Sequence, residues 1–344
     1  MTWYERLTGC VEESPEQVRR DLEVVGDRLR SRKNGRSWRC GRLETPTLGE
    51  LRARVRELSP ARRATTVCEL VGDVQRFHAD HRHKDAFFQV ASQFNLLEMI
   101  SPSVTPERGV GGYEHDRTQG PACAIAAGAG TIYRNYFAPA NGRIGQSEDN
   151  QIDCLADLGA LLGNASGQLW RMVNGYALPT AAGLAAIDDR LASLSDRDWD
   201  ALRQVLRIGL HHDTQVTLES CEHVVSQAYC SALPVAYTDL PGALWKRFAT
   251  LVLEAAYEAT ICAAIVHQAR TGCPRVFLTL LGGGAFGNDF PWIAQAVRRS
   301  LLLYADSGLE VAIVSYGQSK PMVRRLAGEL SGEIAVEFNK TGSV

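Results

Sequence analysis

The sequence has no C-x-x-C pair, no excess of charge of one sign and, by inspection, no apolar run long enough to cross a membrane. Its 344 residues carry a formal charge of −2, which argues against a mainly electrostatic nucleic-acid binder. The first ten residues, MTWYERLTGC, are polar and charged. We therefore expect no membrane segment and no signal peptide.

Cysteine usage excludes a disulfide-stapled fold. The nine cysteines are odd in number, and most lie in apolar stretches. Reduced, buried thiols are the simplest interpretation, and they favour a cytoplasmic protein. Hydrophobic residues at 45% and charged residues at 22% are typical of a soluble globular chain.

Residues 1–64 are interpreted as a helical N-terminal extension. Ser14-Pro15 resembles a capped helix start, and a second helix is expected from Thr47. Between them, residues 28–42 (RLRSRKNGRSWRCGR) are dense in arginine. A solvated hairpin around Asn34-Gly35 is the favoured interpretation, and contact of this basic patch with nucleic acid or an acidic partner is the alternative.

Residues 65–344 alternate short apolar runs with longer helical patterns. Examples of the apolar runs are VCELVGDV, DAFFQVASQFN, RVFLTLLGGG and LEVAIVSYG. Buried strands separated by helices predict an α/β domain, with a mixed, mainly parallel sheet covered on both faces. Residues 139–220 interrupt this alternation and are interpreted as an insertion over one end of the sheet.

A glycine-rich loop follows one of these strands. Gly282–Asn288 (GGGAFGN) lies between an apolar run and a helix whose first turn contains Pro291. Such a loop lets the backbone approach a ligand and points amides and a helix dipole at phosphate. It is neither a G-x-G-x-x-G motif nor a Walker A motif. A tight turn that merely needs glycine is the alternative.

Four motifs in order resemble the macrodomain family. They are Gly72-Asp73, the strand end at Asn95, the loop GGGAFGND and Ser315-Tyr316-Gly317. The loop is most similar to that of the poly(ADP-ribose) glycohydrolase branch, and the resemblance covers about residues 65–335. It implies a three-layer α/β/α macrodomain-like fold. It also implies ADP-ribose or an ADP-ribosylated substrate as partner and no cofactor. Nucleic acid is expected only as a modified substrate or through the basic 28–42 patch.

The resemblance also implies ligand-binding roles. Asp73 would accept a hydrogen bond from the adenine amino group, Tyr316 would stack on adenine, and Asn95 would bind the distal ribose. The alternatives are a turn aspartate, a core aromatic and a strand-ending asparagine. The diphosphate would be held by Gly282, Gly283, Gly284, Ala285, Phe286, Gly287 and Asn288.

The expected catalytic loop departs from the family pattern. The family has Gln-Glu-Glu after its glycines, whereas Gln119 here precedes Gly120-Pro121, so the catalytic glutamate pair is missing. The same loop carries Glu114, His115, Asp116 and Arg117. A carboxylate there could act as general acid or orient water, histidine could shuttle a proton, and arginine could pair with a carboxylate or the diphosphate. An exposed charged loop is the alternative.

Two function hypotheses follow. The first is an ADP-ribosyl hydrolase that cleaves the distal-ribose linkage of ADP-ribosylated protein, nucleic acid or small molecule. The second is a non-catalytic module that binds ADP-ribose or a related nucleotide, and a partner-binding protein that has lost its ligand is a third possibility. The histidine-rich stretch His78, His81 and His83 lacks further ligands at metal-site spacing, so we predict no metal site.

Overall fold

A seven-stranded sheet forms the centre of the protein in a computed structural model that describes residues 1–58, 62–218 and 221–341. From edge to edge the strands are β4 (Arg42–Glu44), β11 (Gly209–Gln215), β12 (Val224–Cys230), β6 (Phe87–Ala91), β13 (Arg275–Leu278), β14 (Glu310–Ser315) and β5 (Thr66–Val71). The run from β12 to β5 is parallel, while β11 is antiparallel to both of its neighbours. This confirms the expected mixed, mainly parallel α/β sheet.

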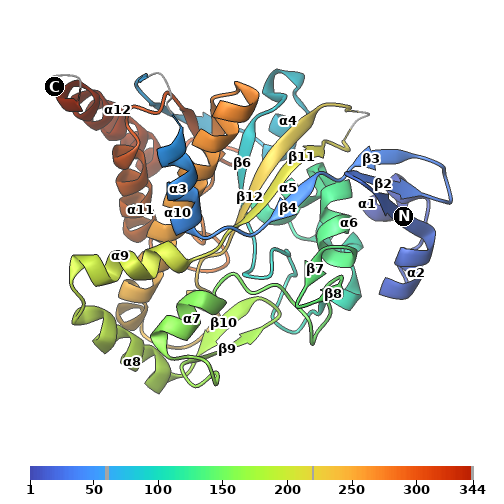
Figure 1. Ribbon diagram of the computed structural model, residues 1–344, viewed down its shortest axis with the longest axis horizontal. Helices are drawn as coiled ribbons and strands as arrows, with labels where there is room; N and C mark the ends of the chain where they lie inside the picture. Colours follow the sequence, from blue (N-terminus) through green and yellow to red (C-terminus); the bar gives the residue numbers. More distant parts are fainter. Residues whose placement is uncertain (59–61, 219–220, 342–344) are drawn as a thin grey trace.

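Helices cover both faces of this sheet (Figure 1). On one face lie α3 (Leu48–Glu57), α10 (Gly242–Thr271), α11 (Phe290–Leu303) and α12 (Pro321–Thr341). On the other lie α4 (Val74–Ala79), α5 (Gln119–Ala126) and α6 (Gly128–Tyr136). The three layers follow from strands that are buried on both sides, such as β6, whose first four residues are all buried.

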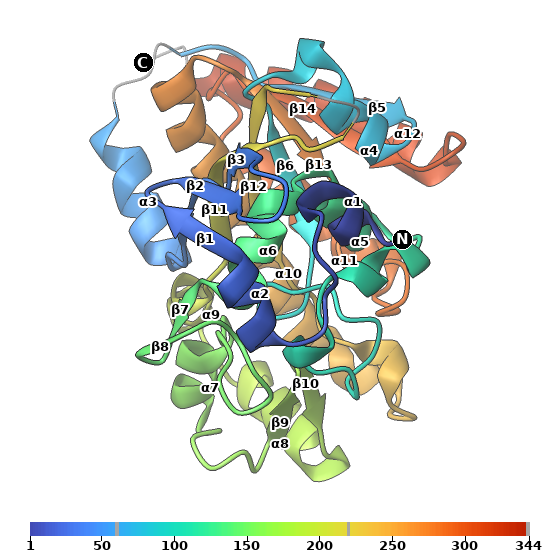
Figure 2. The same cartoon turned by 90° about the vertical axis from the view of Figure 1, so that its right-hand side faces the viewer.

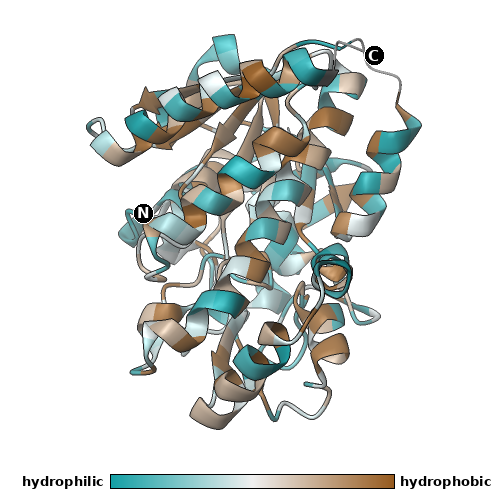
Figure 3. Ribbon diagram, turned by 90° about the vertical axis from the view of Figure 1, so that its left-hand side faces the viewer, coloured by the Kyte–Doolittle hydropathy of each residue, from teal (hydrophilic) through white to brown (hydrophobic). Residues whose placement is uncertain are grey.

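Helix α10 corrects the expectation that no apolar run is long enough to cross a membrane. Its 30 residues are long and apolar enough to cross a membrane, but 89% of its most apolar 18-residue stretch is buried inside the protein. The helix contacts α3, α8, α9 and α11, so its apolar surface is used for packing. By contrast, Figure 3 shows hydrophilic and hydrophobic residues alternating along the helices on the outer surface.

The N-terminal segment is not simply helical, which corrects that part of the prediction. After α1 (Trp3–Thr8) and α2 (Pro15–Asp21), the chain forms an antiparallel sheet of β1 (Leu22–Val25), β2 (Arg28–Ser31) and β3 (Ser37–Arg39). Exposed and buried residues alternate along β2, which is the period of a strand. The expected hairpin around Asn34-Gly35 joins β2 to β3. Strand β4 then enters the central sheet, so this segment is no separate extension.

Residues 139–205 stand between α6 and β11. They form β7 (Pro139–Ala140), β8 (Arg143–Ile144), α7 (Ala156–Leu162), β9 (Trp170–Val173), β10 (Tyr176–Pro179), α8 (Ala181–Ala192) and α9 (Asp196–Val205). They pack where β6 ends, since the Phe94 amide donates to the Gly175 carbonyl at 3.0 Å. Because β11 belongs to the central sheet, the insertion is shorter than expected. The predicted end of the insertion, residue 220, and the predicted end of the domain, residue 344, lie outside the described residues.

The N-terminal segment fastens the loop that precedes α5 (Figure 2). The Glu12 carboxylate accepts hydrogen bonds from the amides of Val110 at 2.9 Å and Gly111 at 2.6 Å, and from the Tyr136 hydroxyl at 2.8 Å. A Cβ on Gly109 would lie 2.5 Å from the Glu12 carboxyl carbon. Glycine in this loop therefore makes room for Glu12, and burial raises the pKa of that carboxyl.

Replacing Glu12 tests this fastening. We expect Glu12→Ala to lower the free energy of unfolding by about 2–3 kcal/mol, because two amides and a hydroxyl lose their acceptor. Urea unfolding followed by tryptophan fluorescence measures the change. Glu13→Ala, at an exposed neighbour, is the matched control and should stay within about 0.5 kcal/mol of wild type. Equal effects of the two substitutions would contradict the assignment.

Candidate functional site

A cavity of about 330 Å³ opens where the five parallel strands end. Its lining residues follow the carboxyl ends of β5, β14, β13, β6 and β12 in turn: Gly72 and Asp73, Tyr316, Thr279 to Phe286, Ser92 and Gln93, and Ala232. Further walls come from the start of α5 and from Tyr176 of β10. The carboxyl edge of a parallel sheet is the usual ligand-binding position in α/β proteins.

The buried helix α10 fixes the start of the glycine loop. The Tyr257 hydroxyl donates to the Thr279 carbonyl at 2.6 Å and accepts from the Leu281 amide at 2.8 Å. Tyr257 is fully buried, so these bonds form away from water. The chain after β13 is thereby held to the core before it enters the cavity wall.

Two glycines of the loop are required by the turn itself. Gly282 and Gly287 have φ of 73° and 70°, and a Cβ would lie 2.4 Å and 2.7 Å from the Cβ atoms of Ala232 and Ala236 respectively. The tight-turn alternative thus accounts for these two positions. A Cβ on Gly284, in contrast, would meet open space.

The middle of the loop presents free amides. Among the residues that the structure describes, the N–H groups of Gly284, Ala285 and Phe286 donate to no protein acceptor. These three residues line the cavity, and helix α11 begins at Phe290 shortly after them. Successive unpaired amides before a helix form a concave donor surface that suits an anion. Asn288 is turned away: it is buried, and its Nδ2 donates to the Leu233 carbonyl at 2.8 Å.

Three of the four other predicted ligand contacts, Asp73, Arg117 and Tyr316, reach the cavity. Asp73 lines it while one carboxylate oxygen accepts from the Gln75 amide at 2.8 Å, capping α4. Tyr316 lines it with 68% of its surface exposed. Asn95 does not line it: its Oδ1 accepts from the Leu97 amide at 3.1 Å, and its Nδ2 donates to Gln151 at 2.8 Å. The chain turns after β6, which directs this side chain into the insertion.

The predicted catalytic residues are divided. Asp116 and Gln119 line the cavity, whereas Glu114 and His115 do not. Glu114 accepts from the Trp3 amide at 3.0 Å and from Arg6 at 3.1 Å, and it therefore holds the start of α1. This corrects the expectation of a catalytic run over residues 114–116, since η3 (Gly111–His115) turns its side chains to different sides.

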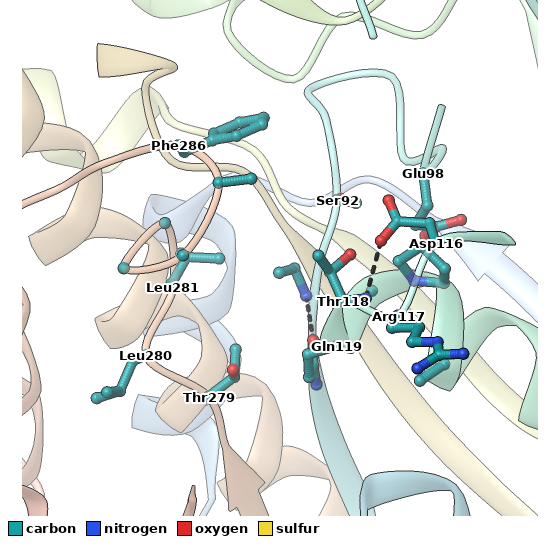
Figure 4. Close-up of a pocket in the computed structure, with 18 of the residues that line it drawn as sticks. Ser92, Glu98, Asp116, Arg117, Thr118, Gln119, Thr279, Leu280, Leu281 and Phe286 are labelled. Carbon is teal, nitrogen blue, oxygen red and sulfur yellow. Dashed lines mark hydrogen bonds between the residues drawn. The ribbon is translucent and has the colours of Figure 1, made fainter. Parts of the chain in front are cut away.

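Gln119 joins α5 to the end of β6. Its Oε1 accepts from the Ala91 amide at 2.9 Å (Figure 4), and its Nε2 donates to the Gln89 carbonyl at 2.8 Å. The next residue, Gly120, stands where the resemblance places a glutamate. A Cβ there would lie 2.0 Å from the Ala91 carbonyl oxygen, so this position accepts no side chain.

One acidic residue of the cavity was missed by the sequence analysis. Glu98 is 2% exposed, yet it lines the cavity, and neither of its carboxyl oxygens has a hydrogen-bond partner among the described residues. Burial raises its pKa to about 8, and the nearby Asp116 adds to the rise. The sequence feature that could have identified Glu98 is its position as a lone glutamate in the apolar run LLEMI, residues 96–100.

Behind Glu98 lies Arg134, which is fully buried. Its Nη2 is 3.6 Å from the Glu98 Oε1, and its guanidinium carbon lies 3.6 Å from the ring centroid of Tyr229. The guanidinium also donates to the Leu96 carbonyl at 3.0 Å and to the Thr131 hydroxyl at 3.1 Å. These contacts fix the cation at the closed end of the site.

Three aromatic rings form another wall that the sequence did not predict. Tyr176 of β10, Tyr237 of η4 (Val235–Tyr237) and Phe286 lie with ring centroids 5.1–5.5 Å apart. The Tyr176 hydroxyl donates to the Met99 carbonyl at 2.7 Å. The insertion therefore contributes directly to the cavity.

The remaining candidates have structural explanations. His78 stacks on Phe88 and hydrogen-bonds the Val74 carbonyl at 2.8 Å, and burial lowers its pKa to about 4. No group of three metal-ligating side chains occurs in the described ranges. The nine cysteines, all within the described ranges, form no disulfide, and six are buried, although Cys68 is exposed. In the basic hairpin, Arg30 and Arg32 both pair with Glu23, so part of its charge is balanced.

Comparison with known proteins gives structural matches only. No family model matches the chain, and no curated protein does. Poly(ADP-ribose) glycohydrolase from Deinococcus radiodurans in complex with ADP-ribose is similar at 15% identity and a TM-score of 0.42, covering 87% of this chain and 94% of that one. The Thermomonospora curvata enzyme is similar at 13% identity and a TM-score of 0.43, covering 94% and 96%. Both are distant structural similarities.

The raised pKa of Glu98 predicts how stability changes with pH. The folded protein keeps this proton up to about pH 8, whereas an ordinary glutamate loses it near 4.5. The stabilisation is thus complete below the unfolded pKa and is lost as pH rises through the folded one. We expect the free energy of unfolding to fall by on the order of 3–5 kcal/mol across this window.

Urea titrations of wild type and Glu98→Gln at a series of pH values measure the effect. The substituted amide cannot titrate, so its stability should lack this fall and exceed that of the wild type at alkaline pH. Parallel curves for the two proteins would contradict the assignment.

Proposed function

We propose that the protein binds ADP-ribose in this cavity and hydrolyses the bond that joins the distal ribose to its attached group. The observation that carries the proposal is the set of free amides at Gly284, Ala285 and Phe286, which share one cavity with Asp73, Tyr316 and Asp116. Free amides suit a diphosphate, an exposed ring suits a base, and a carboxylate suits glycosidic cleavage.

The sheet order gives the order of the subsites. Asp73 and Tyr316 follow the adjacent strands β5 and β14, the glycine loop follows β13, and Ser92 follows β6. From β5 to β12 there are four steps of about 4.8 Å, or roughly 19 Å in all, which suits an extended dinucleotide-like ligand. Adenine then lies over β5 and β14, the diphosphate over β13, and the distal ribose over β6.

Asp116 is the predicted catalytic carboxylate that faces the distal subsite. It is half-buried, and its Oδ1 accepts from the Thr118 amide at 2.8 Å, which orients the group (Figure 4). The exposed Arg117 beside it offers a cation for the diphosphate or for the substrate. A carboxylate held next to the anomeric carbon can position the attacking water.

The second candidate is a binding module without turnover. Two observations favour it: Gly120 accepts no side chain, and Glu114 is engaged with Trp3 and Arg6. Calorimetry with ADP-ribose tests what both candidates share. Incubation with proteins, nucleic acid and small molecules that carry ADP-ribose in different linkages then separates them, because only the hydrolase releases ADP-ribose.

Filling the diphosphate subsite should abolish binding without harming the fold. A Cβ at Gly284 meets open space, so Gly284→Val places its methyl groups in the cavity. We expect the Kd for ADP-ribose to rise at least about 100-fold, which corresponds to roughly 2.7 kcal/mol. Gly332→Val, at an exposed glycine of α12 that is equally open, is the control. Unchanged affinity in Gly284→Val would exclude this loop as the diphosphate site.

The adenine contact has its own test. Asp73→Asn keeps an oxygen for capping α4, since asparagine caps as well as aspartate does. It replaces the outward acceptor with an amide NH2 that faces the adenine amino group as a second donor. We expect about tenfold weaker binding of ADP-ribose in calorimetry, or about 1.4 kcal/mol, with an unchanged melting temperature. Equal affinity would remove Asp73 from the site.

A further inference from the structure

We propose that Glu98 is the general acid of this site and acts together with Asp116 as general base. The inference rests on the proposed hydrolase function and assigns its chemistry to a residue outside the 114–116 run. Glycosidic cleavage needs two carboxyl groups with different roles, one that gives a proton and one that receives it. Glu98 and Asp116 are such a pair because both line the cavity and their environments differ.

Glu98 lies at the cavity, where a general acid must be. Figure 4 shows Glu98 and Asp116 close together on one side of the cavity, opposite the glycine loop that carries Leu281 and Phe286. Both oxygens of Glu98 are buried and have no hydrogen-bond partner in the parts of the chain that the structure covers. The contact of Glu98 to Arg134 at 3.6 Å is an ion pair beyond hydrogen-bond distance, so the carboxyl at this cavity wall keeps its capacity to hydrogen-bond a ligand group.

The surroundings of Glu98 also suit a general acid, because burial raises the pKa of the carboxyl and so favours the form that carries a proton. Five titratable or charged groups face it from the elements packed around it: Arg134 of α6, Tyr113 of η3, Asp116, Cys123 of α5 and Tyr229 of β12. Burial dominates and raises the pKa to about 8, while the Arg134 charge works against the rise. Asp116, which is half-exposed, works in the same direction as burial.

The side chain is also held in one place. The Glu98 amide donates to the Tyr113 hydroxyl at 3.1 Å, which fixes the backbone. A Cβ on Gly120 would lie 3.1 Å from the Glu98 Cγ, so glycine at that position leaves the space that the glutamate stem uses. A positioned acid contributes more to catalysis than a mobile one, since little reorganisation is needed at the moment of reaction.

The bond between the anomeric carbon of the distal ribose and the leaving atom breaks, and the leaving atom takes the proton of Glu98. Water gives one proton to Asp116 as its oxygen bonds to the anomeric carbon. The products are ADP-ribose and the released acceptor. Glu98 regains a proton from solvent, and Asp116 loses one to it.

Glu98→Gln tests the acid role, since an amide has the same shape and no acidic proton. For an acceptor joined through an alkyl oxygen, such as a serine side chain, we expect kcat to fall by about 100-fold or more. The Kd for ADP-ribose should stay within about threefold of wild type. Glu254→Gln is the matched control, because Glu254 is also buried and paired with an arginine, Arg203, but lies outside the cavity.

Two further readouts separate catalysis from a structural role. In the wild type, kcat should fall as pH rises through the pKa of the acid, and Glu98→Gln should lack this limb. An ADP-ribosyl 4-nitrophenyl ether, whose leaving group needs no proton, should be cleaved at nearly equal rates by wild type and variant. The wild-type pH profile and this ether test the idea even where the variant is poorly stable.

The outcomes distinguish the two proposals. Wild-type protein that binds ADP-ribose but cleaves no linkage would overturn the hydrolase, and the role of Glu98 with it. Wild-type turnover with undiminished kcat in Glu98→Gln would overturn only the role of Glu98. Equal losses on the alkyl-linked substrate and the nitrophenyl ether would also overturn it, because a misfolded site loses both.

Discussion

The whole site depends on one constraint of the fold: five neighbouring strands, β12 to β5, run in the same direction. Every chain segment that leaves these strands leaves at one edge, so residues up to about 240 positions apart, such as Asp73 and Tyr316, meet there. The helices cover both faces and leave this edge open. Short turns after each strand then decide which side chains enter the cavity.

The N-terminal segment takes part in the same architecture. Glu12 accepts from two amides at the start of η3, and Trp3 donates its indole N–H to the Val110 carbonyl at 2.9 Å. Glu114 in return accepts from the start of α1. The loop that carries Asp116 is therefore fixed by contacts made on the side away from the cavity. The two glycine-rich loops have different roles. The loop before α5 makes room for the Glu12 carboxylate, whereas the Gly282–Asn288 loop exposes amides to the cavity.

The sequence predicted what depends on patterns along the chain. Continuous apolar runs gave β5, β6, β13 and β14, and the strand–glycine–helix pattern gave the loop at Gly282. It did not predict side-chain direction. Glu114 and Asp116 are two residues apart, but a turn of η3 sends the first to α1 and the second to the cavity. Glu98 was missed because its role depends on burial beside Arg134, a contact between residues 36 positions apart.

The burial of Glu98 also makes its charged form energetically unfavourable in this core. A leucine would suit the apolar run of residues 96–100, but it would leave the buried Arg134 cation without the carboxyl that faces it. A glutamate that kept its charge would carry a large desolvation cost, which Arg134 at 3.6 Å and Tyr113 offset only in part. The protonated form avoids most of that cost and still faces the guanidinium. The same environment that makes Glu98 unfavourable for stability at high pH is what keeps a transferable proton at the cavity wall.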